Sequence, residues 1–179
     1  MHSDNTDHHK MTTFLFIIYL ILLTWIVVFK MQFSVEALMQ FTSFRSVNLV
    51  PFQGTAVYDG ILDFREVLFN VLAFVPFGIY ISMLKQNWVF LKKLAPIAVV
   101  SLTFEISQFI FSIGSSDVTD FLGNTFGGVI GIGIYFLFRR LFKGKATQAL
   151  NLLAFLATIA VLIFGLLLRF GVIQMEYLT

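Results

Sequence analysis

Two short phrases of the sequence place an acidic residue four positions before an asparagine, at the start of a long apolar run. The first is EVLFN, from Glu66 to Asn70, which leads into VLAFVPFGIYI. The second is DVTDFLGNTFGG, in which Asp120 precedes Asn124 by four positions and Asp117 stands one turn earlier. Residues four apart lie on one face of a helix. Each phrase therefore places carboxylate and amide oxygens side by side, where they can bind a hard cation or hydrogen-bond to a polar ligand.

The chain that carries these phrases has the composition of an integral membrane protein. Of its 179 residues, 58% are hydrophobic and only 12% are charged, whereas soluble domains are about 25% charged. Its mean hydropathy is +0.88. The lack of cysteine excludes disulfides and thiolate metal sites, and a net charge of +2 gives no reason to expect nucleic-acid binding.

Five stretches are long enough to span a bilayer as helices, because a span needs about 20 mostly apolar residues. We therefore predict an all-α integral membrane bundle with about five transmembrane helices. The first is interpreted as an uncleaved signal-anchor helix, because its apolar run is too long for the core of a signal peptide. The predicted spans are 12–29, 66–84, 93–112, 119–138 and 149–170.

The chain divides into four parts on this interpretation. A disordered cytoplasmic tail (1–11) precedes the signal anchor (12–29). A core with an external segment and three spans follows (30–138). The C-terminal part (139–179) contains a cytoplasmic basic loop, the fifth span and an external tail, and no motif marks that span, which we expect to be scaffold.

The placement of Lys and Arg predicts the orientation, because short loops rich in these residues stay in the cytoplasm. The loops near 85–93 and 139–148 carry three and four of them, and the hairpin near 112–118 carries none. We therefore expect a multi-pass membrane protein with its N-terminus in the cytoplasm and its C-terminus outside.

In this orientation, most acidic and amide residues of the chain lie at the outer ends of the spans. In the third span, Ser101, Glu105 and Gln108 step by four and three residues, which aligns them on one helix face. We expect these groups to converge on one outer site. The candidate ligand-binding residues are Glu66, Asn70, Glu105, Gln108, Asp117, Asp120, Asn124, Arg45 and Asn48.

Several of these residues also have a purely structural interpretation. Asp117 and Asp120 can cap the helix that they begin, and Glu66 can do the same for its own helix. Asn70 and Asn124 can join helices by hydrogen bonds within the membrane.

Glu105 differs from the other acids, because it lies about two turns inside its span, too far from the end to cap it. Ionisable residues inside a membrane are costly, and they mark functional sites by default. We therefore expect Glu105 to have a functional role, with Arg45 or Arg65 as its counter-charge.

Small residues predict how the fourth span packs. Gly123, Gly127 and Gly131 recur at intervals of four, a spacing that lets two helix backbones approach closely. The stripe should therefore face other helices rather than lipid.

The sequence resembles the VanZ-like family of bacterial membrane proteins in four phrases, found in the family's order within residues 45 to 138. The phrases are NLVPF (Asn48 to Phe52), NVLAFVPFG (Asn70 to Gly78), FEISQFIF (Phe104 to Phe111) and DVTDFLGNTFGGVIG (Asp117 to Gly131). The family is named after a protein associated with resistance to teicoplanin, a glycopeptide antibiotic. The resemblance implies a role in the bacterial cell envelope, but it supplies no reaction. The external hairpin reads SIGSSD and lacks the Arg that some members carry there.

Two functions fit these features, and a third fits them less well. The first is binding, without catalysis, of a membrane lipid, a lipid-linked wall precursor or a glycopeptide-type antibiotic. The second is a membrane-embedded enzyme that acts on a phosphate-bearing lipid through a divalent cation, Mg or Ca. The third is a small transporter. No catalytic motif is present, so no catalytic residue is assigned. The metal ligands of the second alternative would be Glu66, Glu105, Asp117 and Asp120.

Overall fold

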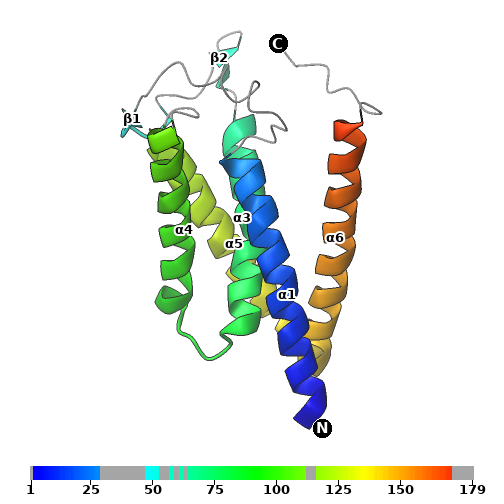
Figure 1. Cartoon of the computed structure of the whole chain (residues 1–179). Coiled ribbons are helices and arrows are strands. Elements are labelled where there is room, and N and C mark those ends of the chain that lie inside the picture. The colour runs from blue at the N-terminus through cyan, green and yellow to red at the C-terminus, as the bar shows by residue number, and fades with distance from the viewer. Residues whose placement is uncertain are drawn as a thin grey trace.

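The protein is a bundle of long helices with short strands at one end (Figure 1). The computed structural model describes residues 2–28, 47–52, 57–58, 61–62, 64–111 and 116–170. The helices are α1 (His2–Val27), α3 (Arg65–Leu84), α4 (Phe90–Phe111), α5 (Val118–Phe142) and α6 (Ala146–Arg169). A short 3₁₀ turn, η1 (Lys143–Lys145), joins α5 to α6. The strands are β1 (Val47–Asn48), β2 (Val57–Tyr58), β3 (Ile61–Leu62) and β4 (Ser116–Asp117).

The prediction of an all-α membrane bundle is confirmed. Within the described ranges, four helical stretches are long and apolar enough to cross a membrane. The last of these, Val118–Leu167, contains both α5 and α6 in succession. The five predicted spans thus correspond to the five long helices.

Successive helices run in opposite directions along the bundle (Figure 1). The four strands lie at the end where α3 and α5 begin. There β1 pairs in parallel with β4, with Asn48 opposite Asp117, and β2 pairs with β3 in an antiparallel hairpin. These short ladders bring residues from distant parts of the sequence to the helix ends.

Helical structure extends further than predicted at the other end of the bundle. α1 begins at His2, so residues 2–11 are helical rather than a disordered tail. The hydroxyl groups of Thr12 and Thr13 donate hydrogen bonds to the carbonyl oxygens one turn earlier, in His8 and His9. The predicted basic loop at 139–148 is likewise helical, because α5 continues to Phe142 and α6 begins directly after η1.

The contact between α3 and α5 is the most extensive in the bundle, and glycines make it close. A Cβ atom added to Gly127 would collide with the carbonyl oxygen of Val71, and one added to Gly131 would collide with that of Val75. At the upper end of the same face, a Cβ atom on Gly123 would lie 3.6 Å from the Cβ of Asn70. The predicted glycine stripe therefore does face another helix.

A neighbouring face of α5 packs against α4, which also contacts α3 directly. A Cβ atom on Gly128 would collide with the side chain of Ile97. Next to this contact, Phe74 and Phe77 of α3 and Phe104 of α4 form a buried aromatic cluster. α1 is fastened to α3 through the hydroxyl of Tyr19, which donates a hydrogen bond to the carbonyl oxygen of Ala73 at 2.7 Å.

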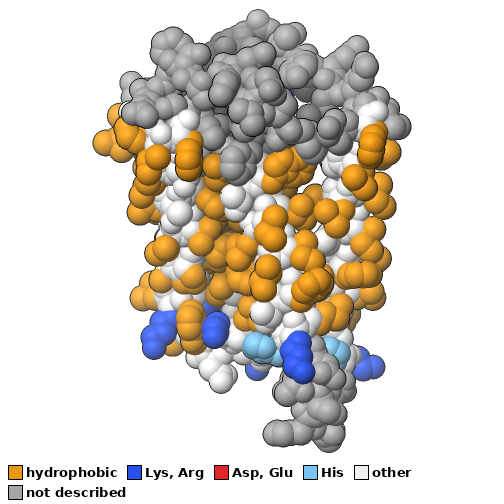
Figure 2. All heavy atoms as spheres, viewed as in Figure 1, with side chains coloured by type: hydrophobic (Ala, Val, Ile, Leu, Met, Phe, Trp, Pro, Cys, Tyr) orange, Lys and Arg blue, Asp and Glu red, His pale blue; other side chains and the backbone are white. Residues whose placement is uncertain are grey.

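The outer faces of the helices are strongly apolar, as a lipid environment requires. Hydrophobic side chains cover the sides of the bundle, while Lys and Arg gather at the end where α1 begins (Figure 2). Exposed residues of this kind include Phe14, Ile21, Phe69, Phe136 and Leu152.

Replacement of Gly127 or Gly131 by alanine should destabilise the protein. The obstructing atoms belong to the backbone of α3, which cannot rotate away, so the helices must separate at a cost of about 1–3 kcal/mol per substitution. Thermal unfolding in detergent measures the effect as a lowered midpoint. Gly133→Ala is the matched control, because it lies in the same helix with no atom within 4 Å of the added methyl group. Equal midpoints for all three variants would contradict the packing described above.

Candidate functional site

Asp117 connects three segments at the end of the bundle where α5 begins. As the N-cap residue of α5, it accepts a hydrogen bond at Oδ1 from the backbone N–H of Thr119 at 2.7 Å. Its Oδ2 accepts a bond from the Asn48 side-chain amide at 3.0 Å. Its own backbone N–H donates to Oε2 of Glu105 at 2.9 Å. The capping role considered for Asp117 is therefore confirmed, and it coexists with contacts to β1 and α4.

The segment after β1 is held against the start of α5 by two further hydrogen bonds. The backbone N–H of Phe52 donates to the Thr119 hydroxyl at 2.9 Å. The backbone N–H of Val50 donates to Oδ1 of Asn48 at 3.1 Å. Asn48 thus uses its amide nitrogen for Asp117 and its amide oxygen for its own loop, which fixes the orientation of the amide.

Glu105 is buried in the bundle, with 3% of its surface exposed. Only Oε2 is hydrogen-bonded, and Oε1 has no partner among the described residues. The charges of Asp117 and Asp120 lie close enough to act on the Glu105 carboxyl group. Burying a polar atom without a hydrogen bond is costly. Oε1 of Glu105 is therefore a buried oxygen that a hydrogen-bond partner would stabilise.

Asn124 and Gln108 present further polar atoms of this kind. Asn124 is fully buried (0% exposed), and within the described part of the chain neither atom of its amide has a partner. Gln108 donates from Nε2 to the carbonyl oxygen of Val27 at 2.9 Å, which leaves its Oε1 without a described partner.

Two contacts show where Asn124 lies relative to α4. Gly128 meets Ile97, and the Ser101 hydroxyl lies 3.5 Å from the carbonyl oxygen of Phe121. Asn124 precedes Gly128 by one helical turn, as Ser101 follows Ile97 by one turn in the antiparallel helix. Asn124 is therefore level with Ser101 at the α4–α5 interface, one turn deeper in the bundle than Glu105.

Of the acid–amide pair on α3, Asn70 lies against α5, whereas Glu66 does not lie in the buried group. Asn70 packs against α5 at Gly123. Glu66, in the first turn of α3, is exposed, as is Arg65. The N-cap residue of α3 is Phe64, with no side-chain capping bond. Arg45, the other predicted counter-charge, lies outside the described residues.

The four carboxylates considered as metal ligands differ in environment. Glu105 is buried and Glu66 is exposed, while Asp117 and Asp120 are half-buried. Over the ranges that the structure describes, no three residues among His, Cys, Asp and Glu lie together in a way that could hold a metal ion. The alternative of a divalent-cation site gains no support from this geometry.

A polar contact at the opposite end of the bundle was not predicted from the sequence. Thr12 and Asn151 are 1% and 2% exposed, and the Thr12 hydroxyl lies 3.0 Å from Oδ1 of Asn151. Next to them, Nε2 of Gln148 lies 2.9 Å from Nε2 of His8. α6 is therefore joined to α1 by specific polar contacts. His8 and Thr12 are four positions apart on α1, and Gln148 and Asn151 are three apart on α6. Each pair therefore lies on one helix face, a pattern from which the contact could have been predicted.

Comparison with known proteins identifies relatives of this chain. A family model described as VanZ/LLP1 matches residues 16–139, which is more than half of the chain. The curated protein named Protein VanZ, from Enterococcus faecium, is 42% identical over 118 residues, which are 66% of this chain and 69% of that protein. No solved structure matches the chain. The matched region includes α3, α4 and most of α5, and therefore the whole set of polar residues around Asp117.

Substitutions of Glu105 should separate its hydrogen bond from its charge. Glu105→Gln keeps an acceptor for the Asp117 N–H and removes repulsion from neighbouring carboxylates, so thermal stability should stay the same or rise. Glu105→Ala leaves that N–H without an acceptor and should cost about 1–3 kcal/mol. The unfolding midpoint in detergent measures both effects. Glu66→Gln is the control at an exposed carboxylate. A larger loss for Glu105→Gln than for Glu105→Ala would contradict the assignment.

An exchange of donor and acceptor tests the contact between Asn48 and Asp117. Asp117→Asn still caps α5, but its amide nitrogen would face the amide nitrogen of Asn48, so stability should fall. Adding Asn48→Asp restores a donor–acceptor pair and still accepts the bond from Val50. The double variant should therefore recover about 1 kcal/mol relative to the sum of the single variants. Additive losses in unfolding free energy would show that the two side chains are not in contact.

Proposed function

Because the chain belongs to the VanZ/LLP1 family, we propose that it is a multi-pass plasma-membrane protein of the bacterial envelope that lowers susceptibility to teicoplanin-type glycopeptides. Its site is the group of buried polar residues where α4 meets α5, and its ligand is an amphiphile with a polar head group. The observation that carries this proposal is the set of buried polar atoms without a described partner in Glu105, Gln108 and Asn124.

These atoms define the chemistry of the ligand. The oxygens of Glu105, Gln108 and Asn124 are acceptors, and the Asn124 nitrogen is the one donor of the set. Each buried acceptor left unpaired costs about 1–3 kcal/mol, so a ligand that supplies N–H or O–H groups gains that energy on binding. Sugar hydroxyls, peptide amides and ammonium groups meet this requirement. Lipid-linked wall precursors and glycopeptide antibiotics carry such groups.

The same chemistry favours binding over the enzymatic alternative. A phosphate group presents acceptors and negative charge, and it would meet the Glu105 carboxyl group and its acidic neighbours without a cation between them. Among the described residues, no three of the types His, Cys, Asp and Glu are grouped to hold such a cation. Phosphate-directed chemistry is therefore the weaker candidate at this end.

The surroundings of the site suit a ligand that remains partly in lipid. Leu68 and Phe69 of α3, Ile110 and Phe111 of α4 and Leu122 of α5 are exposed apolar residues near the same helix ends. An apolar tail can stay in the bilayer along these faces while the head group reaches the polar atoms.

The orientation of the protein is part of the proposal. Lys and Arg gather at the end of the bundle where α1 begins (Figure 2), which by the rule for basic residues is cytoplasmic. The site around Asp117 then lies on the side of the outer leaflet, where wall precursors and glycopeptides are found.

Expression of the protein in a susceptible Gram-positive bacterium tests the proposal. The minimal inhibitory concentration of teicoplanin should rise several-fold with the wild-type protein and return to the baseline with Glu105→Gln or Asn124→Leu. Both variants remove acceptors from the site without removing a hydrogen bond that holds the fold. Asn124→Leu should even raise the unfolding midpoint, because it removes a buried amide without a described partner.

Thr103→Val is the matched control, since Thr103 is exposed on the same helix, α4, and bonds only within its own helix. This variant should protect as the wild type does, at equal protein level by immunoblot. Full protection by Asn124→Leu would overturn the assignment of the site. No protection by the wild-type protein would overturn the proposed function.

A further inference from the structure

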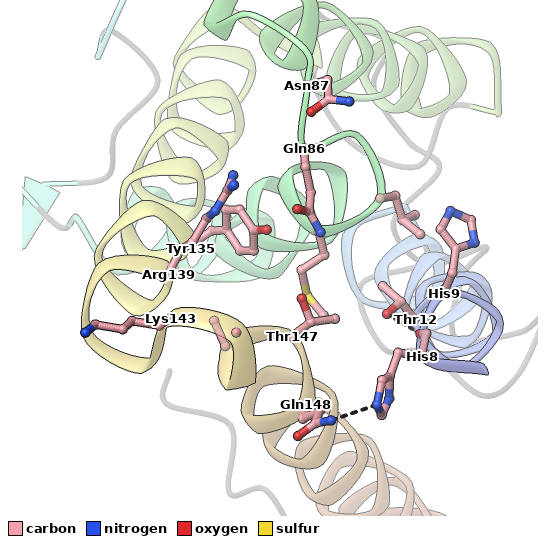
Figure 3. Close-up of a pocket in the computed structure, with 14 residues that line it drawn as sticks. His8, His9, Thr12, Gln86, Asn87, Tyr135, Arg139, Lys143, Thr147 and Gln148 are labelled. Atoms are coloured by element: carbon pink, nitrogen blue, oxygen red, sulfur yellow. Dashed lines mark hydrogen bonds between the residues drawn. The ribbon is translucent and has the colours of Figure 1, made fainter. Parts of the chain in front are cut away.

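The basic end of the bundle contains a large cavity that is separate from the site around Asp117. It has a volume of about 910 Å³ and lies where the first turns of α1 and α6 meet the last turns of α3 and α5. Figure 3 shows side chains from all four helices around it. From this cavity and its neighbour we infer a second binding site, which takes a membrane phospholipid by its phosphate head group.

The chemistry of the cavity wall fits an anion. Arg139 lies beside Tyr135, and Lys143 stands at the rim with its side chain extended outward (Figure 3). Gln86 and Thr147 add uncharged hydrogen-bond donors. None of the described lining residues is Asp or Glu. Arg is well suited to phosphate, because its planar guanidinium group can donate two parallel hydrogen bonds.

An apolar cavity adjoins the polar one and would hold the acyl chain of the lipid. Its volume is about 420 Å³, and it is lined by residues of α1, α3, α5 and α6. Almost all of these side chains are apolar, among them Leu22, Pro76, Phe138 and Leu153. Met83 lines both cavities. A polar cavity with positive charge that continues into an apolar groove matches a phosphate head group with an acyl chain.

The wall between α1 and α6 is held in place by the polar contacts described above. Gln148 reaches His8 at 2.9 Å (Figure 3), and the buried pair of Thr12 and Asn151 lies one turn further into the bundle. These contacts fix α1 against α6 on one side of both cavities. Specific side-chain contacts between α1 and α6 therefore hold this wall of the cavity in place.

A phospholipid fits better than free phosphate, because free phosphate would use only the polar half. The cavity lies at the end of an apolar bundle, level with the head groups of the adjacent leaflet. Anionic lipids in that leaflet attract basic segments. The inferred site thus binds an anion at one end of the bundle, while the site of the proposed function binds hydrogen-bond donors at the other.

Binding of phosphatidylglycerol to the delipidated protein in detergent tests the inference by native mass spectrometry and thermal shift. The wild-type protein should bind one molecule and gain stability. Arg139→Gln should weaken the affinity about tenfold, the effect of one charge-assisted bond. Lys145→Gln is the matched control, because it removes the same charge from the neighbouring η1 turn at a residue outside the lining, and it should bind as the wild type does.

A second variant separates the lipid from a free anion. Ala157→Leu narrows the apolar groove from an exposed position on α6. It should therefore weaken the binding of phosphatidylglycerol, and it should leave the unfolding midpoint in inorganic phosphate the same as that of the wild type. Equal loss in Arg139→Gln and Lys145→Gln would mean general surface attraction and would overturn the site. Inorganic phosphate that stabilises as well as the lipid, with no effect of Ala157→Leu, would overturn the lipid as occupant. The proposed function of the other end would survive either result.

Discussion

The direct contact between the backbones of α3 and α5 determines the geometry of the whole bundle. At Gly127 and Gly131 there is no room for even one more carbon atom, so the rotation of α5 about its own axis is fixed. The face of α5 that carries Asn124 and Gly128 is thereby directed at α4. The same rotation brings the first turn of α5 next to Glu105, where Asp117 can donate to its carboxyl group.

Several features of this arrangement could be predicted from the sequence, because they are local. Hydropathy predicted the five long helices, and the spacing of the glycines predicted which face of α5 packs against another helix. The acid–amide phrases were correctly placed on helices, but only one of them lies in the buried site. Whether Glu66 or Glu105 is buried depends on how each helix is turned toward its neighbours, which spacing within one helix does not reveal.

Other features were hidden because they join residues far apart in the chain. The parallel pairing of β1 with β4 places Asn48 beside Asp117, although 69 positions separate them. The contacts between α1 and α6 connect Thr12 with Asn151. As a result, α6, which was interpreted from the sequence as scaffold, forms part of the wall of a cavity. Buried acceptors thus lie near one end of the bundle and basic residues at the other, and our two proposals assign opposite kinds of polar ligand to these ends.

The most direct test of the account is to identify what the acceptor-rich end binds. Native mass spectrometry of the wild-type protein, purified in mild detergent from a Gram-positive host, would detect ligands that remain bound. We expect an amphiphile with a sugar or peptide head group on the wild-type protein and its loss in Asn124→Leu, with phospholipid adducts unchanged. The same adducts on both proteins, or phospholipid alone on the wild type, would contradict the claim that the buried acceptors beside Asp117 form a ligand site.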